Sequence, residues 1–337
     1  MKLLLRIAFA LFLAVAVAAV LLAVSLTRPY KGFDRPVYLV LDKGTPTREF
    51  AGRLVDAGIV RYQWQFLLAR ALRPHTVLQA GEYEFAQPDS VLHIFERIAK
   101  GDVYVYLLTV PEGSNIFDIA ALLQHAGLTR AGDFLQDASD PKTIRDLDPA
   151  APSLEGYLFP STYSVNHLTT GAQLCREMTG EFRKRWKQLT ANRAANVHEV
   201  VTLASMVEKE AAVPSDRPLI ASVFFNRLSK QMRLECDPTT IYAAELERRY
   251  RGAIYRSDLN NRNSYNTYQH EGLPPGPIAN PGLSSLKAVL NPAQTDYLFF
   301  VAKPDNSGAH QFSRTLAEHV EAVRKYRRGQ AKAAGTR

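Results

Sequence analysis

The sequence predicts an α+β protein attached to a membrane by one N-terminal helix. Three observations lead to this fold class. Residues 7–26 carry no charge, and residues 36–108 combine short strand and helix patterns. From about residue 150 the chain has the pattern of a larger mixed α+β domain with longer helices.

The run at residues 7–26 (IAFALFLAVAVAAVLLAVSL) has enough residues for a helix that crosses a hydrocarbon core of about 30 Å. The alternative is a cleaved signal peptide. Ala14-Val15-Ala16 offers a small-x-small site, but the apolar run continues beyond it. We therefore expect an uncleaved anchor after a short N-terminus at residues 1–6. Cations on both sides of the run leave its orientation open.

The net charge of +8 favours an anionic partner such as phospholipid, nucleic acid or a carboxylate-bearing polymer. The basic residues are dispersed and carry no nucleic-acid-binding signature, so we expect no nucleic acid. The two cysteines, Cys175 and Cys236, are too few for a structural zinc site and leave the redox compartment open. No P-loop, dinucleotide-binding glycine pattern or HExxH motif is present, which disfavours phosphoryl transfer, nicotinamide chemistry and zinc proteolysis.

The region at residues 36–108 is expected to be a small α+β module. Its predicted strands are Pro36–Gly44, Ala80–Phe85 and Val103–Val110, and its predicted helices are Gly44–Val60 and Ser90–Gly101. The segment Gly113–Thr129 partly repeats Gly44–Val60 as a glycine turn, a helix and an Ala-Gly stop. This repeat is either a common β-turn-α packing unit or part of a ligand site.

The larger domain is expected to contain three long helices, a stiff loop rich in Pro and Gly, a strand and a closing helix. In order, these are Gly171–Leu189, Glu199–Ala212, Arg217–Met232, Glu271–Gly282, Asp296–Ala302 and Thr315–Tyr326. The basic tail at residues 328–337 is expected to be disordered.

Glu208, in ASMVEKEAA (Ala204–Ala212), shares a helical stripe with apolar side chains. Burial and the negative end of the helix dipole both favour its protonated form, which a general acid requires. The alternative is an ion pair with Arg217 or Arg227. Glu210 lies about 200° further round the helix, so the two carboxylates are not expected to share a site.

A glycosidase with two carboxylates would need its second acid elsewhere. Asp237 and Glu271 are candidates, although both are explained more simply as turn residues. The stretch NSYNTYQHEGLPPGP (Asn263–Pro277) offers amides, hydroxyls and tyrosine rings that could bind sugars, or it is a rigid connection. His310 could contribute to a site, although a lone histidine is more often structural.

Six separated segments together resemble one family, the membrane-anchored endolytic murein transglycosylases (MltG or YceG-like). They are LEGYLFPSTY, ASMVEKEAA, VFFNRL, DPTTIY, SYNTYQHEGLPPGPIANPG and AHQFSRTLAEH, in this order. The resemblance covers the chain from the anchor to Tyr326. It implies that residues 36–108 form a LysM-like module and that residues 109–327 form a catalytic transglycosylase domain.

The resemblance implies cleavage of the β-1,4 bond between N-acetylmuramic acid and N-acetylglucosamine in nascent glycan strands, leaving 1,6-anhydro ends. It places the catalytic glutamate at Glu208, which acts first as acid and then as base, with no second carboxylate, cofactor or metal. Expected substrate-binding residues are Glu155, Asn226, Asp237, Tyr265, Asn266, Thr267, Tyr268 and His310. Cys236 departs from the family pattern, in which threonine or serine is expected before the aspartate.

The resemblance also implies a single-pass protein of the inner (cytoplasmic) membrane, with its N-terminus in the cytoplasm and its catalytic domain in the periplasm. The expected partners are peptidoglycan glycan strands, the cell membrane and peptidoglycan synthases. Two alternatives remain. One is a non-catalytic anchor that binds peptidoglycan through residues 36–108. The other is a pyridoxal-phosphate-dependent aminodeoxychorismate lyase, against which the anchor and the missing phosphate cup argue.

Overall fold

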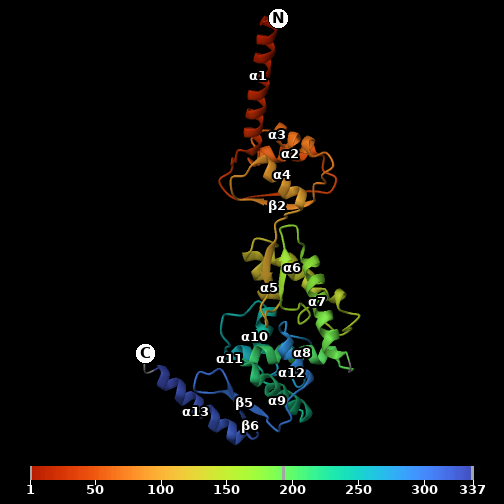
Figure 1. Ribbon diagram of the computed structural model, residues 1–337. Helices are drawn as coiled ribbons and strands as arrows, with labels where there is room; N and C mark the ends of the chain where they lie inside the picture. Colours follow the sequence, from red (N-terminus) through yellow and green to blue (C-terminus); the bar gives the residue numbers. More distant parts are fainter. Residues whose placement is uncertain (1, 192–193, 335–337) are drawn as a thin grey trace. The chain divides into compact units, whose positions relative to one another are not determined.

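The computed structural model describes residues 2–191 and 194–334, and its helices and strands confirm a mixed α+β fold (Figure 1). The chain divides into two compact units. The first extends to Tyr106 and includes Asn166–Leu168, and the second comprises Leu107–Val165 and the chain from Thr169 onward.

The first unit begins with α1 (Lys2–Thr27), the one helix in the described part of the chain that is long and apolar enough to cross a membrane. Most of its side chains are exposed, as expected for a helix that lies in lipid. Its last turn is different. Leu26 is buried in the core of the unit, and the Gln65 side chain donates a hydrogen bond to the carbonyl of Ser25 at 2.9 Å.

The rest of the first unit is a two-stranded antiparallel sheet packed with three helices. The strands are β1 (Val37–Leu41) and β2 (Gly81–Phe85), and the helices are α2 (Thr47–Asp56), α3 (Gln63–Leu72) and α4 (Val91–Lys100). Phe66 packs against both Phe50 and Phe95 in its core, and the burial of these aromatic rings with the surrounding aliphatic side chains stabilises the unit.

The repeat seen in the sequence is a repeat in structure. Gly44 precedes α2 and Gly113 precedes α5 (Ile116–His125), and both glycines have positive φ, at 89° and 76°. Gly58 and Gly127 end the two helices with φ of 69°. A side chain at these positions would be strained, which explains why glycine recurs at both ends of each copy.

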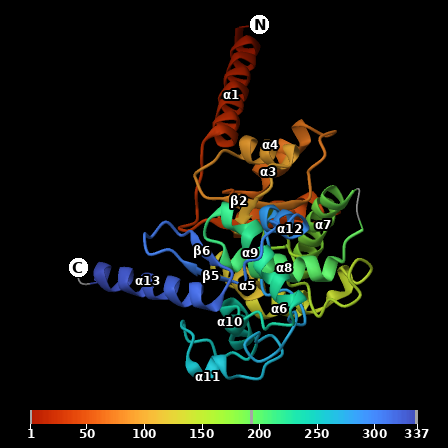
Figure 2. The ribbon, with the colours of Figure 1, turned by 90° about the horizontal axis from the view of Figure 1, so that it is seen from below.

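The second unit contains a helical core and a β-hairpin. Its elements are β3 (Tyr106–Thr109, whose first residue belongs to the first unit), α5, α6 (Ala131–Ser139), β4 (Thr162–Val165), α7 (Gly171–Thr190), α8 (Val197–Glu210), α9 (Arg217–Ser229), α10 (Asp237–Leu246), α11 (Arg256–Leu259), α12 (Leu283–Leu290), β5 (Phe299–Ala302), β6 (His310–Ser313) and α13 (Leu316–Ala334). Helices α8, α9 and α12 pack together, and α13 lies along the antiparallel β5–β6 hairpin (Figure 2).

Two local expectations are corrected by the structure. Asp237 is the first residue of α10 rather than a turn residue, because Pro238 is well tolerated in the first turn of a helix. The closing helix runs to Ala334, so the tail expected to be disordered from residue 328 begins within α13, where its Arg, Lys and Ala residues are good helix formers. The last part of that tail, residues 335–337, lies outside the described residues.

Candidate active site

A pocket of about 300 Å³ lies where the C-terminal end of α8 meets the β5–β6 hairpin. It is lined by Glu210, Arg227, Leu234, Glu235, Asp237, Tyr268, Phe300, Val301, Ala302, His310 and His319. Three of these residues, Asp237, Tyr268 and His310, belong to the set that the sequence predicts. The pocket collects acids, bases and a hydroxyl from six separate segments of the second unit.

Glu210 is the last residue of α8 and is partly buried against this pocket. Burial raises the pKa of Glu210 to about 7, with a further upward contribution from the charge of Asp237; a hydrogen bond from Cys236 acts in the opposite direction. The Cys236 thiol donates this bond to Glu210 Oε1 at 3.2 Å. A carboxyl group that keeps its proton near neutral pH is suited to general acid catalysis.

Glu208 lies on the other side of the helix, and its side chain is 6% exposed. Its Oε1 accepts a hydrogen bond from the Arg217 guanidinium at 3.1 Å, and its Oε2 accepts one from the backbone N–H of Gly282 at 2.9 Å. This is the ion pair that the sequence offers as the alternative to catalysis. Glu208 is not among the residues that line the pocket.

A second carboxylate, Glu112, lies beside this ion pair. A Cβ placed at Gly282 would collide with the Glu112 carboxyl group, so Gly282 and Glu112 are in close approach. Burial raises the pKa of Glu112, and the negative charge of Glu208 adds to this effect. Gly113 also packs against the Glu208 side chain. Glu208 is therefore enclosed by the Glu112–Gly113 turn, Gly282 and Arg217.

Two polar pairs shape the floor of the pocket. The Tyr268 hydroxyl donates to Asp237 Oδ1 at 2.6 Å, while burial and the charge of Asp237 raise the pKa of Tyr268. Arg227 donates to Glu235 Oε2 at 3.2 Å and to the carbonyl of Leu298 at 2.7 Å. These contacts hold the side chains of both pairs in place at the pocket.

His310 is oriented by a buried carboxylate. Oδ2 of Asp216 accepts a hydrogen bond from the backbone N–H of His310 at 2.7 Å and lies 3.0 Å from His310 Nδ1. Both side chains are about nine-tenths buried, at 10% and 8% exposed. A carboxylate on Nδ1 fixes the ring and leaves Nε2 as the atom that can interact with a ligand.

Asp216→Asn is expected to lower the kcat/KM of any reaction catalysed at this pocket by roughly 10- to 100-fold, because His310 would lose its orienting charge. His310→Gln should produce a loss of similar size, and the double variant should lose little more than either single one. His75→Gln, at an exposed histidine of the first unit, is the control. Steady-state kinetics check this, and full activity in Asp216→Asn would contradict it.

The other predicted substrate-binding residues have structural partners. The Asn226 amide donates to the carbonyls of Thr295 and Tyr297, at 2.7 and 2.9 Å. Asn266 is fully buried, and its amide donates to the carbonyls of Asp258, Leu259 and Asn261. Thr267 is also buried and accepts the backbone N–H of Cys236 at 3.0 Å. These three residues hold the walls of the pocket in position without lining it.

Glu155 and Tyr265 also lie away from the pocket. Glu155 is 1% exposed, and burial raises its pKa to about 8. Tyr265 packs its ring edge-on against Tyr242, with centroids 5.1 Å apart, and burial raises its pKa to about 12.

Sequence reasoning missed Glu210, Arg227, Glu235 and His319 as pocket residues. His319 stacks on Phe299, and its Nδ1 is buried without a hydrogen-bond partner. Burial and the charge of Arg227 lower the pKa of His319. The sequence offers one signal for His319: it ends the AHQFSRTLAEH segment, nine residues after His310. Only the pairing of β5 with β6 and the packing of α13 reveal its position.

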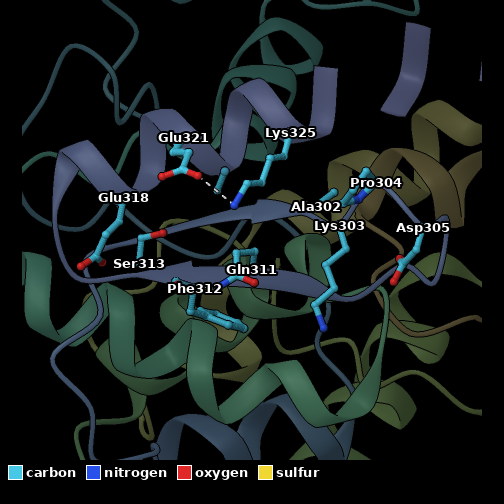
Figure 3. A pocket seen from close by; sticks show the side chains of 11 residues that line it. Ala302, Lys303, Pro304, Asp305, Gln311, Phe312, Ser313, Glu318, Glu321 and Lys325 are labelled. Atoms are coloured by element: carbon cyan, nitrogen blue, oxygen red, sulfur yellow. Dashed lines mark hydrogen bonds and ion pairs between the residues drawn. The ribbon is translucent and has the colours of Figure 1, made fainter. Parts of the chain in front are cut away.

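A second pocket, of about 450 Å³, lies between the β5–β6 hairpin and α13 (Figure 3). Several charged side chains that line it are already paired with neighbouring groups. Glu321 pairs with Lys325 along the exposed face of α13, and Glu318 accepts the backbone N–H groups of Arg314 and Thr315. Hydrogen bonds from Lys325 and Ser307 lower the pKa values of Glu321 and Asp305, so neither acid is suited to hold a proton near neutral pH. Among residues 2–191 and 194–334, no cluster of three or more His, Cys, Asp or Glu side chains is arranged to hold a metal ion.

Comparisons with known proteins agree with the motif pattern. The model of the YceG-like family matches residues 39–325. An endolytic murein transglycosylase of Bacillus subtilis (strain 168) is 32% identical over 309 residues, which cover 86% of this chain and 84% of that protein. An endolytic murein transglycosylase of Streptococcus pneumoniae (strain D39) is 30% identical over 324 residues and 83% of this chain, which spans 58% of that longer relative.

The crystal structure of a yceG-like protein from Listeria monocytogenes is also similar, with a TM-score of 0.56 and 30% sequence identity. The match covers 86% of this chain and 99% of the other. The family model and the relatives cover both units, so the match does not depend on one short motif. The chain belongs to the YceG-like family.

Proposed function

We propose that this protein is an endolytic lytic transglycosylase that cleaves the β-1,4 bond between N-acetylmuramic acid and N-acetylglucosamine in nascent peptidoglycan. The relatives named for this activity support the substrate class. The observation that carries the proposal is Glu210, a glutamate whose pKa is raised to about 7 at a polar pocket.

In the proposed reaction, protonated Glu210 donates its proton to the glycosidic oxygen as the bond from that oxygen to C1 of the muramic residue breaks. The Glu210 carboxylate then accepts the proton of the C6 hydroxyl, whose oxygen bonds to C1. The products are a free 4-hydroxyl on one fragment and a 1,6-anhydro end on the other. The proton lost by Glu210 is regained, and no water is consumed.

We prefer Glu210 to Glu208 as the catalytic acid because the surroundings of the two side chains differ. Both carboxylate oxygens of Glu208 already accept hydrogen bonds within the protein, one from a guanidinium and one from a backbone amide. Glu210 faces a pocket that also contains Asp237, Tyr268 and His310. Glu208 remains the second candidate.

We further infer a single-pass protein of the inner membrane, in which α1 is the anchor, its N-terminus is cytoplasmic and the catalytic domain at residues 109–327 is periplasmic. Residues 36–108 are proposed to be a LysM-like module that holds glycan strands. The long apolar helix and the net charge of +8, which suits a carboxylate-bearing polymer, support this arrangement. Peptidoglycan synthases are the expected protein partners.

Mass spectrometry of purified glycan strands after digestion tests the reaction. We expect internal cleavage that yields fragments ending in 1,6-anhydro-muramic acid, with no incorporation of ¹⁸O from labelled water. Reducing ends that carry ¹⁸O would instead identify a hydrolase. If wild-type protein binds the strands but leaves them uncut, the non-catalytic anchor would become the better description.

A further inference from the structure

The Cys236 thiol is in direct contact with the proposed catalytic acid. Its sulfur donates to Glu210 Oε1 at 3.2 Å, and the residue is 1% exposed. The Cys236 backbone N–H donates to Thr267 Oγ1 at 3.0 Å, and that hydroxyl is paired with Thr239 Oγ1 at 2.9 Å. Cys236 also immediately precedes α10. The thiol is therefore held in place by buried polar contacts.

The thiol acts as a hydrogen-bond donor. Burial, followed by the negative charge of Glu210, raises the pKa of Cys236 well above its ordinary value, so the sulfur keeps its proton. A donor aimed at a carboxylate favours the ionised form, but a thiol is a weaker donor than a hydroxyl. Cys236 therefore orients the carboxyl group while opposing its protonation only weakly.

We propose that Cys236 is a positioning residue for Glu210, and that its thiol, as a weak donor, sets the upper pH limit at which Glu210 works as the acid. This inference rests on the proposed role of Glu210. It assigns a function to Cys236, which stands where the family resemblance leads us to expect threonine or serine.

Replacing Cys236 removes none of the other ionisable groups around the pocket. The ionisable groups facing Glu210 are Asp237 and Tyr268, the Arg227–Glu235 ion pair, the His310–Asp216 pair and His319. Of these, Asp237 acts on Glu210 through its charge and favours protonation. Exchanging the sulfur of Cys236 for oxygen strengthens the donor that faces Glu210, and the alanine variant removes this donor.

The test is the pH dependence of kcat/KM in Cys236→Ser and Cys236→Ala. In the parent, activity should fall as the pH rises through the pKa of Glu210, because the acid loses its proton. The serine hydroxyl should move this alkaline limb to lower pH by roughly 0.5 to 1 unit, and alanine should move it to higher pH by a similar amount. Cys236→Thr provides a second hydroxyl variant if the serine protein is unstable.

Cys175→Ser and Cys175→Ala are the matched controls, because Cys175 is equally buried, on α7, and does not line the pocket. Their alkaline limbs should coincide with that of the parent. Unchanged limbs in folded Cys236 variants would overturn the inference and leave the role of Glu210 intact. Parental activity in Glu210→Gln would instead overturn that role, and the inference with it.

Discussion

Replacing Glu210 by glutamine is expected to lower the rate of anhydro-product formation by roughly 10²- to 10⁴-fold, the range in which general acid–base catalysis contributes. Glutamine keeps the shape of the side chain and can still accept the Cys236 hydrogen bond. It has no proton to give to the leaving oxygen and no carboxylate to accept one from the C6 hydroxyl. Single-turnover digestion of purified strands, followed by mass spectrometry, measures this loss.

Glu208→Gln is the matched comparison on the same helix. It removes one partner of the buried ion pair with Arg217 and should therefore lower the melting temperature. The activity of the protein that remains folded should stay within a few-fold of the parent. The reverse pattern, with a stable but inactive Glu208→Gln and an active Glu210→Gln, would transfer the catalytic role to Glu208.

Much of the fold could be predicted because several helices carry local signals. Helix α4 begins after Ser90, whose hydroxyl accepts the N–H of His93, and ends at Gly101 in the left-handed conformation. Helix α3 was missed because its N-cap is Tyr62, which is not a usual capping residue. Strand β6 was also missed. It has four residues with little alternation and forms only through pairing with β5.

The site was predicted less completely because the sequence does not say which side of α8 faces the ligand. Glu208 and Glu210 each have Lys209 on one side and an apolar residue on the other, and both lie near the end of the helix. What distinguishes them are contacts from distant parts of the chain, namely Arg217 and Gly282 at Glu208, and Cys236 at Glu210. Five of the six motif segments contribute residues that line the pocket, and packing is what distinguishes Glu210 from Glu208.

Replacing Glu155 by alanine is expected to lower the free energy of unfolding by about 3 kcal/mol or more. Glu155 Oε2 accepts the N–H of Ile116 at 3.0 Å, and Oε1 accepts the Asn280 amide at 2.9 Å. Asn280 in turn donates to the carbonyl of Ser114 and accepts the N–H of Leu158. Truncation would leave buried donors unsatisfied where three chain segments meet. Chemical denaturation at pH 6 measures the loss.

The pH dependence of stability provides the sharper test of Glu155. Its pKa in the folded protein, about 8, lies above the ordinary value of 4.5, so the folded state binds the extra proton between these two values. The contribution of Glu155 to the free energy of unfolding is therefore fully present below about pH 4.5. It is lost as the pH rises through 8, by about 1.4 kcal/mol per pH unit at most.

Glu155→Gln cannot ionise, so its deficit relative to the parent should shrink as the pH is raised from 6 to 8.5. Glu271→Gln, at an exposed loop residue, should run parallel to the parent across the same range. A Glu155→Gln curve that also runs parallel to the parent would mean that Glu155 is already ionised at pH 6. The buried junction of Ile116, Asn280 and Glu155 would then hold a charge rather than a neutral acid.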